Sequence, residues 1–112
     1  MKRDASVFLG HILESINRIE EFTEGMSKED FLDSVMMQDA VIRRIEIIGE
    51  ASKNLTADFR EKHSGIQWSD MIRTRDKISH GYFGVDINLA WDIVKSDLPV
   101  LKEKIEKIIG EI

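Results

Sequence analysis

The sequence predicts an all-α fold: one antiparallel bundle of four main helices with a short additional helix. Apolar residues recur at helical spacing along the 112-residue chain, one proline and seven glycines leave few interruptions, and no segment alternates convincingly as a strand. The length suits a single domain, residues 1–112, and 42% hydrophobic with 33% charged residues is typical of a folded helical protein.

The first helix is expected from about Asp4 to Glu24, with Asp4 or Ser6 as its N-cap and Gly25 after its end. Its inward-facing stripe comprises Leu9, Ile12, Ile16, Ile19 and Phe22 or Thr23. This stripe predicts that one face of the first helix packs against the rest of the bundle.

The second helix is expected from Ser27, with Asp30 completing a loose capping box, to about Lys53. Phe31, Val35, Ile42, Ile45 and Ile48 face one way, and Met37, Val41, Ile47 and Ala51 widen the apolar band. So wide a band predicts a central helix with several neighbours.

Small residues near the end of this helix, Gly49 and Ala51 among them, predict that another helix approaches closely there. Arg44 falls inside the apolar band and needs a partner or a cleft. Glu50 is either the carboxylate that holds a basic side chain such as Arg44 or Arg75, or a solvated glutamate.

The remaining helices are predicted from their caps. Thr56 caps a short helix reaching about His63, and a helix from Trp68 contains Arg75 and His80. Asp86 caps the next helix. Pro99 predicts a break or a kink, with Ser96 or Asp97 as a fresh cap, before a final helix from about Leu98 to Gly110. His11 and His63 are expected to be ordinary helix histidines.

Arg75 stands within the apolar stripe of the Trp68 helix, which also contains Met71, Ile72 and Ile78. A guanidinium is always charged, so this face must meet a carboxylate, a cleft open to water, or a bound anion. Because the stripe is too apolar for water, we predict that it forms part of a homodimer interface.

His80 follows Arg75 at the end of the same helix, where Gly81 stops it. An arginine and a histidine that converge on one anion suit phosphoryl-transfer chemistry, since histidine moves protons near neutral pH and arginine binds phosphate oxygens. The plainer alternative is a buried Arg75–Asp76 pair beside a histidine that caps the helix.

Net charge and residue counts narrow the function classes. A net charge of −5 argues against a nonspecific nucleic-acid binder, although residues 71–82 carry a local excess of positive charge. No cysteine is present and the histidines lack metal-ligand spacing, so neither a metal nor another cofactor is expected. No apolar run is long enough for a membrane span, and we predict a cytoplasmic protein.

The run Arg75-Asp76, three residues, then His80 and Tyr82 resembles the Arg-x4-His-x-Tyr motif of the HEPN superfamily, in its HepT-like branch. The segments from His80 to Asp86 and from Ile47 to Ala51 are similar to that branch as well, and the resemblance extends over nearly the whole chain. It implies a helical bundle that cleaves RNA without a metal.

The resemblance implies roles for single residues. Arg75 would bind the scissile phosphate, His80 would be general acid or base, and Asp76 would orient either side chain. It also implies a homodimer and a toxin–antitoxin pair, in which a small nucleotidyltransferase antitoxin modifies Tyr82. The alternative is a non-catalytic binding subunit of such a nucleotidyltransferase.

Overall fold

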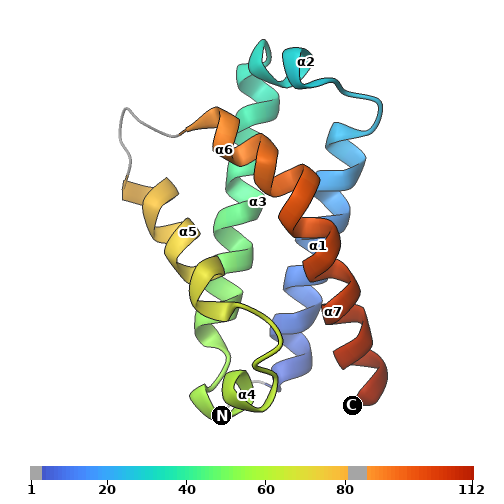
Figure 1. The fold of residues 1–112 in the computed structure, drawn as a ribbon, viewed down its shortest axis with the longest axis vertical. Helices are drawn as coiled ribbons and strands as arrows, with labels where there is room; N and C mark the ends of the chain where they lie inside the picture. Colours follow the sequence, from blue (N-terminus) through green and yellow to red (C-terminus); the bar gives the residue numbers. More distant parts are fainter. Residues whose placement is uncertain (1–3, 81–85) are drawn as a thin grey trace.

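The computed structural model describes residues 4–80 and 86–112, and for residues 78–80 it describes the backbone only. The described chain is helical and has no strand: α1 Ala5–Thr23, α2 Lys28–Leu32, α3 Val35–Asn54, α4 Ala57–Lys62, α5 Trp68–His80, α6 Ile87–Asp92, the π-helical turn η1 Ile93–Asp97 and α7 Leu98–Glu111. Figure 1 shows α1, α3, α5 and α7 running alternately up and down. The predicted all-α bundle is confirmed.

The centre of the bundle is α3, which packs against α1 on one side and α5 on the other (Figure 1). The predicted stripe of α1 is confirmed: Leu9, Ile12, Ile16 and Ile19 are fully buried and Thr23 nearly so. From α3, the buried residues include Val41, Ile45, Ile48 and Ala51. Burial of these faces supplies most of the stability of such a fold.

The cap residues set the ends of most helices as predicted. Asp4 caps α1, Thr56 caps α4 and Asp86 caps α6, each through a side-chain oxygen that accepts a backbone N–H. Gly25, with φ of 72°, follows α1 in the left-handed region that favours glycine.

The second helix does not run unbroken from Ser27 to Lys53, and that prediction was wrong. The capping box of Ser27 and Asp30 is present, but it starts the five-residue α2. Ser34 then caps α3 by accepting the Met37 N–H at 3.2 Å. Gln38 Nε2 donates to the carbonyl oxygens of Phe31 and Leu32, both at 3.0 Å, and so satisfies the end of α2.

The corner between α2 and α3 changes which apolar residues face the core. Phe31 is fully buried and its ring lies 5.2 Å from the Trp91 ring of α6, centroid to centroid. Val35, predicted to face inward, is 68% exposed, and Met36 is 77% exposed. The corner therefore leaves large apolar side chains in solvent at one end of the bundle.

Of the break or kink predicted at Pro99, the break is absent: the backbone stays helical through a π-helical turn, and no fresh cap forms there. Asp97 has helical dihedrals and makes no side-chain capping bond. The Leu98 N–H bonds instead to the Ile93 carbonyl, five residues back, in a π-helical turn. Pro99 falls in the first turn of α7, where a missing N–H costs little.

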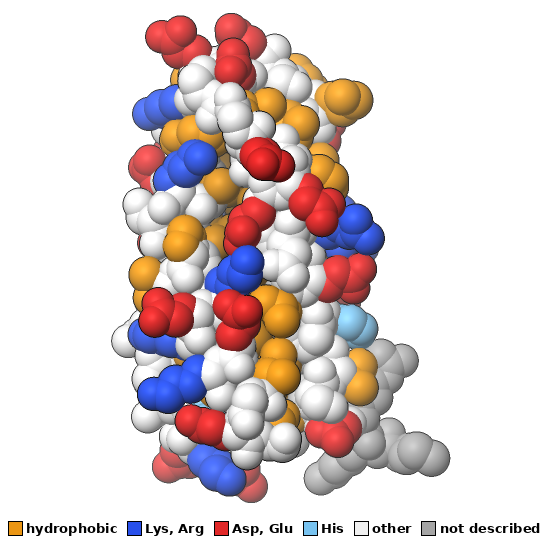
Figure 2. All heavy atoms as spheres, turned by 90° about the vertical axis from the view of Figure 1, so that its right-hand side faces the viewer, with side chains coloured by type: hydrophobic (Ala, Val, Ile, Leu, Met, Phe, Trp, Pro, Cys, Tyr) orange, Lys and Arg blue, Asp and Glu red, His pale blue; other side chains and the backbone are white. Residues whose placement is uncertain are grey.

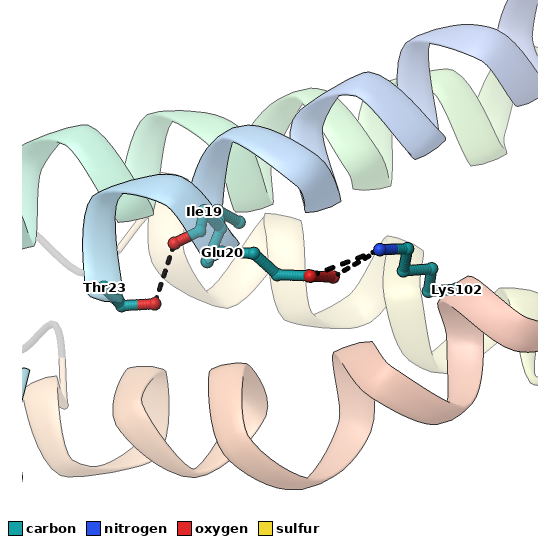
Figure 3. Close-up of polar contacts among 4 residues, drawn as sticks. All are labelled: Ile19, Glu20, Thr23 and Lys102. Carbon is teal, nitrogen blue, oxygen red and sulfur yellow. Dashed lines mark hydrogen bonds and ion pairs between the residues drawn. The ribbon is translucent and has the colours of Figure 1, made fainter. Parts of the chain in front are cut away.

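A polar contact joins α7 to α1 across the surface. Lys102 Nζ lies 3.0 Å from Glu20 Oε1, and nearby Thr23 Oγ1 donates to the Ile19 carbonyl at 2.8 Å (Figure 3). Both charged side chains are partly exposed, so we expect the pair to contribute at most about 1 kcal/mol. The view of this side in Figure 2 shows acidic and basic side chains intermixed with hydrophobic ones.

The new cap at Ser34 leads to a stability prediction. Ser34→Ala removes the acceptor for the Met37 N–H, so we expect the free energy of unfolding to fall by about 1 kcal/mol in urea denaturation. The control is Ser6→Ala, since Ser6 is an exposed serine in the first turn of α1 that does not cap it. Equal stability of both variants would contradict the capping role.

Candidate functional site

The start of α5 is fixed to the preceding segment through Trp68. The indole is 5% exposed, its Nε1 donates to the His63 carbonyl at 3.0 Å, and its ring lies 6.4 Å from the Phe59 ring. Trp68 is thus core, not part of an exposed stripe. Because Trp68 is buried within the protomer, it is not available to the homodimer interface that was predicted from the apolar stripe of α5.

Arg75 lies on the side of α5 that meets α3. Its side chain is 29% exposed, and Nη1 donates to Asp76 Oδ1 at 3.0 Å. The Asp76 side chain is 48% exposed, so the pair lies at the surface and not in the core as the plainer alternative required. A guanidinium carries five N–H donors, and among the residues that the structure describes only Asp76 accepts from that of Arg75.

The stem of Arg75 packs against the backbone of α3 at Gly49. A Cβ atom built on Gly49 would lie 2.9 Å from Arg75 Cγ, 2.9 Å from the Met71 carbonyl oxygen, and closer still to Arg75 Cβ. Gly49 is buried. The predicted close approach of a helix is therefore confirmed, and the approaching helix is α5.

His80 is the last residue of α5, five residues beyond Arg75. On an ideal helix this separation is roughly 7.5 Å along the axis. The side chain of His80 and the whole of Tyr82 lie outside what the structure describes. The structure therefore gives the order and spacing of the motif, with Arg75 and Asp76 in contact.

The other candidates from the sequence are not joined to Arg75. Glu50 is exposed, Arg44 is half-buried, and neither makes a hydrogen bond or ion pair with a described residue. Glu50 thus corresponds to the solvated alternative. His63 ends α4 and packs its ring 4.5 Å from the Phe59 ring, and His11 is exposed, so both are the ordinary helix histidines predicted.

A groove opens between α5 and the η1–α7 segment. It has a volume of about 280 Å³ and is lined from α5 by Asp70, Met71 and Thr74. Opposite them stand Asp97 and Lys104, with apolar residues between. Arg75 does not line this groove, since its stem turns toward Gly49 of α3.

Among the residues with described side chains, no group of three or more histidines and carboxylates is placed to hold a metal ion. No helix in the described part of the chain is long and apolar enough to cross a membrane.

Comparison with known proteins gives a consistent set of relatives. The chain is 53% identical over 112 residues to "Gamma-glutamylcyclotransferase and putative RNase MJ0434" of Methanocaldococcus jannaschii, of which it spans half the length. It is 52% identical over 108 residues to "Probable ribonuclease HepT" of Thermococcus cleftensis, covering 96% of this chain and 98% of that one. "Putative RNase MJ1380" of M. jannaschii is 46% identical over 105 residues, or 94% and 96% of the two chains.

No solved structure matches the chain. The family model described as "Ribonuclease HepT-like" matches residues 12–108, which include α3, the Arg75–Asp76 pair and His80. The match covers far more than half of the 112 residues. The chain therefore belongs to the HepT-like ribonuclease family.

Proposed function

We propose that this protein is a metal-independent endoribonuclease in which Arg75 binds the scissile phosphate and His80 transfers protons. The observation that carries the proposal is the partly exposed Arg75 side chain, 29% accessible, with one guanidinium donor directed to Asp76. Family membership and the printed names of the relatives support RNA as the substrate.

The chemistry requires few groups because RNA contains its own nucleophile. The 2′-hydroxyl loses its proton to a base and attacks phosphorus, the P–O5′ bond breaks, and the 5′ oxygen leaves after gaining a proton. This gives a 2′,3′-cyclic phosphate and a 5′-hydroxyl. His80 acts as base or acid in these transfers, and Arg75 stabilises the charge on the non-bridging oxygens.

Asp76 has a supporting role in this proposal. Its carboxylate accepts from Arg75 Nη1 at 3.0 Å, which limits the orientations of the guanidinium plane. A guanidinium held in this way loses less conformational freedom when it binds phosphate.

The first prediction for this function concerns the two motif residues. Arg75→Ala and His80→Ala are expected each to abolish RNA cleavage and growth inhibition while the helical content is retained, because Arg75 is partly exposed and His80 ends its helix. A fluorogenic RNA assay with circular dichroism measures both. The matched control is Arg73→Ala, a 70%-exposed arginine on the same helix. Cleavage by purified His80→Ala protein would rule out its proton-transfer role.

We further propose that two copies associate so that two motifs share one cleft. The apolar stripe of α5 no longer argues for this, since Trp68 and the Gly49–Arg75 contact are internal to the chain. Support comes instead from the exposed apolar side chains of Leu32, Val35 and Met36, with Leu89 on α6. Figure 1 shows that α2 and α6 lie at the same end of the bundle.

A homodimer is therefore expected by sedimentation at micromolar concentration. Met36→Lys places a charge on a side chain that is 77% exposed in the protomer, so it should favour the monomer without loss of fold. A wild-type monomer at that concentration would contradict the dimer. A dimer unaffected by Met36→Lys would place the interface elsewhere.

We propose that the ribonuclease is the toxin of a toxin–antitoxin pair in the cytoplasm and that a nucleotidyltransferase antitoxin silences it at Tyr82. Tyr82 follows His80 by two residues, so a nucleotide attached to its hydroxyl would bring a phosphate to the motif. That phosphate would compete with RNA for Arg75. Tyr82 itself is not required for the chemistry in this scheme.

Tyr82→Phe tests the switch because it removes only the acceptor oxygen. Coexpressed with the nucleotidyltransferase, the variant should remain toxic and gain no mass in intact-protein mass spectrometry. Wild-type protein in the same cells should gain the mass of one or more nucleotides and lose toxicity. Neutralisation and modification of Tyr82→Phe would move the switch to another residue.

A further inference from the structure

α3 and α5 approach each other closely at the residue that carries the proposed phosphate contact. Three atoms of α5 surround the place that a Cβ of Gly49 would occupy: Arg75 Cβ, Arg75 Cγ at 2.9 Å and the Met71 carbonyl oxygen at 2.9 Å. Real Cβ atoms essentially never approach other heavy atoms below 3.0 Å. The stem of Arg75 therefore lies directly on the backbone of α3.

This requirement for glycine is local to the crossing. Gly10, in the interior of α1, and Gly110, near the end of α7, have no neighbouring atom within 4 Å of an added Cβ. Alanine is the better helix former at such open positions. At Gly49, by contrast, an added methyl group would collide with the turn of α5 between Met71 and Arg75.

We propose that Gly49 is a positioning residue that sets where the Arg75 guanidinium stands. The inference rests on the proposed function of Arg75. It concerns the place of the guanidinium and assigns no contact between Gly49 and RNA.

A methyl group at position 49 would displace the guanidinium by two routes. Arg75 Cβ and the Met71 carbonyl are rigid parts of α5, so relief of those contacts must move the helix away from α3. The contact with Arg75 Cγ is relieved by rotation about χ1, which moves the guanidinium relative to the α5 backbone and hence relative to the Cα of His80. Rotation about χ1 separates the phosphate contact from the proton-transfer residue, whereas movement of α5 carries both residues together away from α3.

The kinetic test compares Gly49→Ala with Gly10→Ala in single-turnover and steady-state RNA cleavage. Misplacement of a group by an ångström costs up to about 100-fold in rate, so we expect kcat of Gly49→Ala to fall by roughly 10- to 100-fold. KM should change by less than about threefold, because the effect is on the reacting phosphate. Gly10→Ala should keep the wild-type kcat, since its methyl group projects into open space.

A thermal-denaturation experiment tests the contact between Gly49 and Arg75 and does not depend on enzymatic activity. Gly49→Ala is expected to lower Tm by about 5 to 10 °C, whereas Gly10→Ala should leave Tm unchanged or raise it. In an Arg75→Gly background, Gly49→Ala should cost clearly less, because Arg75 Cβ and Cγ are absent. Equal costs in the two backgrounds would contradict the contact.

The outcomes separate this proposal from the proposed function. Rates are divided by the folded fraction from circular dichroism, and a folded Gly49→Ala with wild-type kcat would overturn the positioning role. A chain that does not fold at all would assign Gly49 to the fold alone and would equally overturn it. Full cleavage by Arg75→Ala would instead refute the proposed function, and the Tm arm would still report on the contact.

Discussion

The contact between Gly49 of α3 and the Arg75 stem of α5 is the constraint on which the site depends. At this contact the backbone of α5 lies very close to the backbone of α3, at the position of a charged side chain that has to reach the surface. Cβ and Cγ of the arginine lie against α3, while the side chain stays partly exposed and its guanidinium donates to Asp76. A basic residue in an apolar stripe is thereby accommodated without a buried, unpaired charge.

Other features of the fold support that crossing from both ends. At the start of α5, the Trp68 indole is buried and hydrogen-bonded to the His63 carbonyl, which fixes the helix relative to α4. At the centre, α3 is held by the fully buried stripe of α1. The position of Arg75 thus follows from packing across most of the bundle.

Family membership and geometry contribute different parts of the functional argument. The match over residues 12–108 connects the chain to ribonucleases, and the proposed contact of Arg75 with an RNA phosphate depends on that connection. The geometry adds that the Arg75 side chain is partly exposed, that Asp76 is a partner of its guanidinium, and that Glu50 is not. Neither source alone would distinguish a phosphate-binding arginine from a structural ion pair.

The sequence by itself determined the features that arise from local chemistry. Asp4, Thr56 and Asp86 capped their helices and Gly25 ended one, because a cap depends on residues within one turn of itself. The order and spacing of the motif residues from Arg75 to His80 likewise follow from the sequence alone. Tertiary structure decided the rest: Gln38 reaches back over six and seven residues to separate α2 from α3, and Gly49 meets a helix more than twenty residues away in sequence. Periodicity gives the face of a helix that will be buried, but the identity of its partner is set by the packing of the whole bundle.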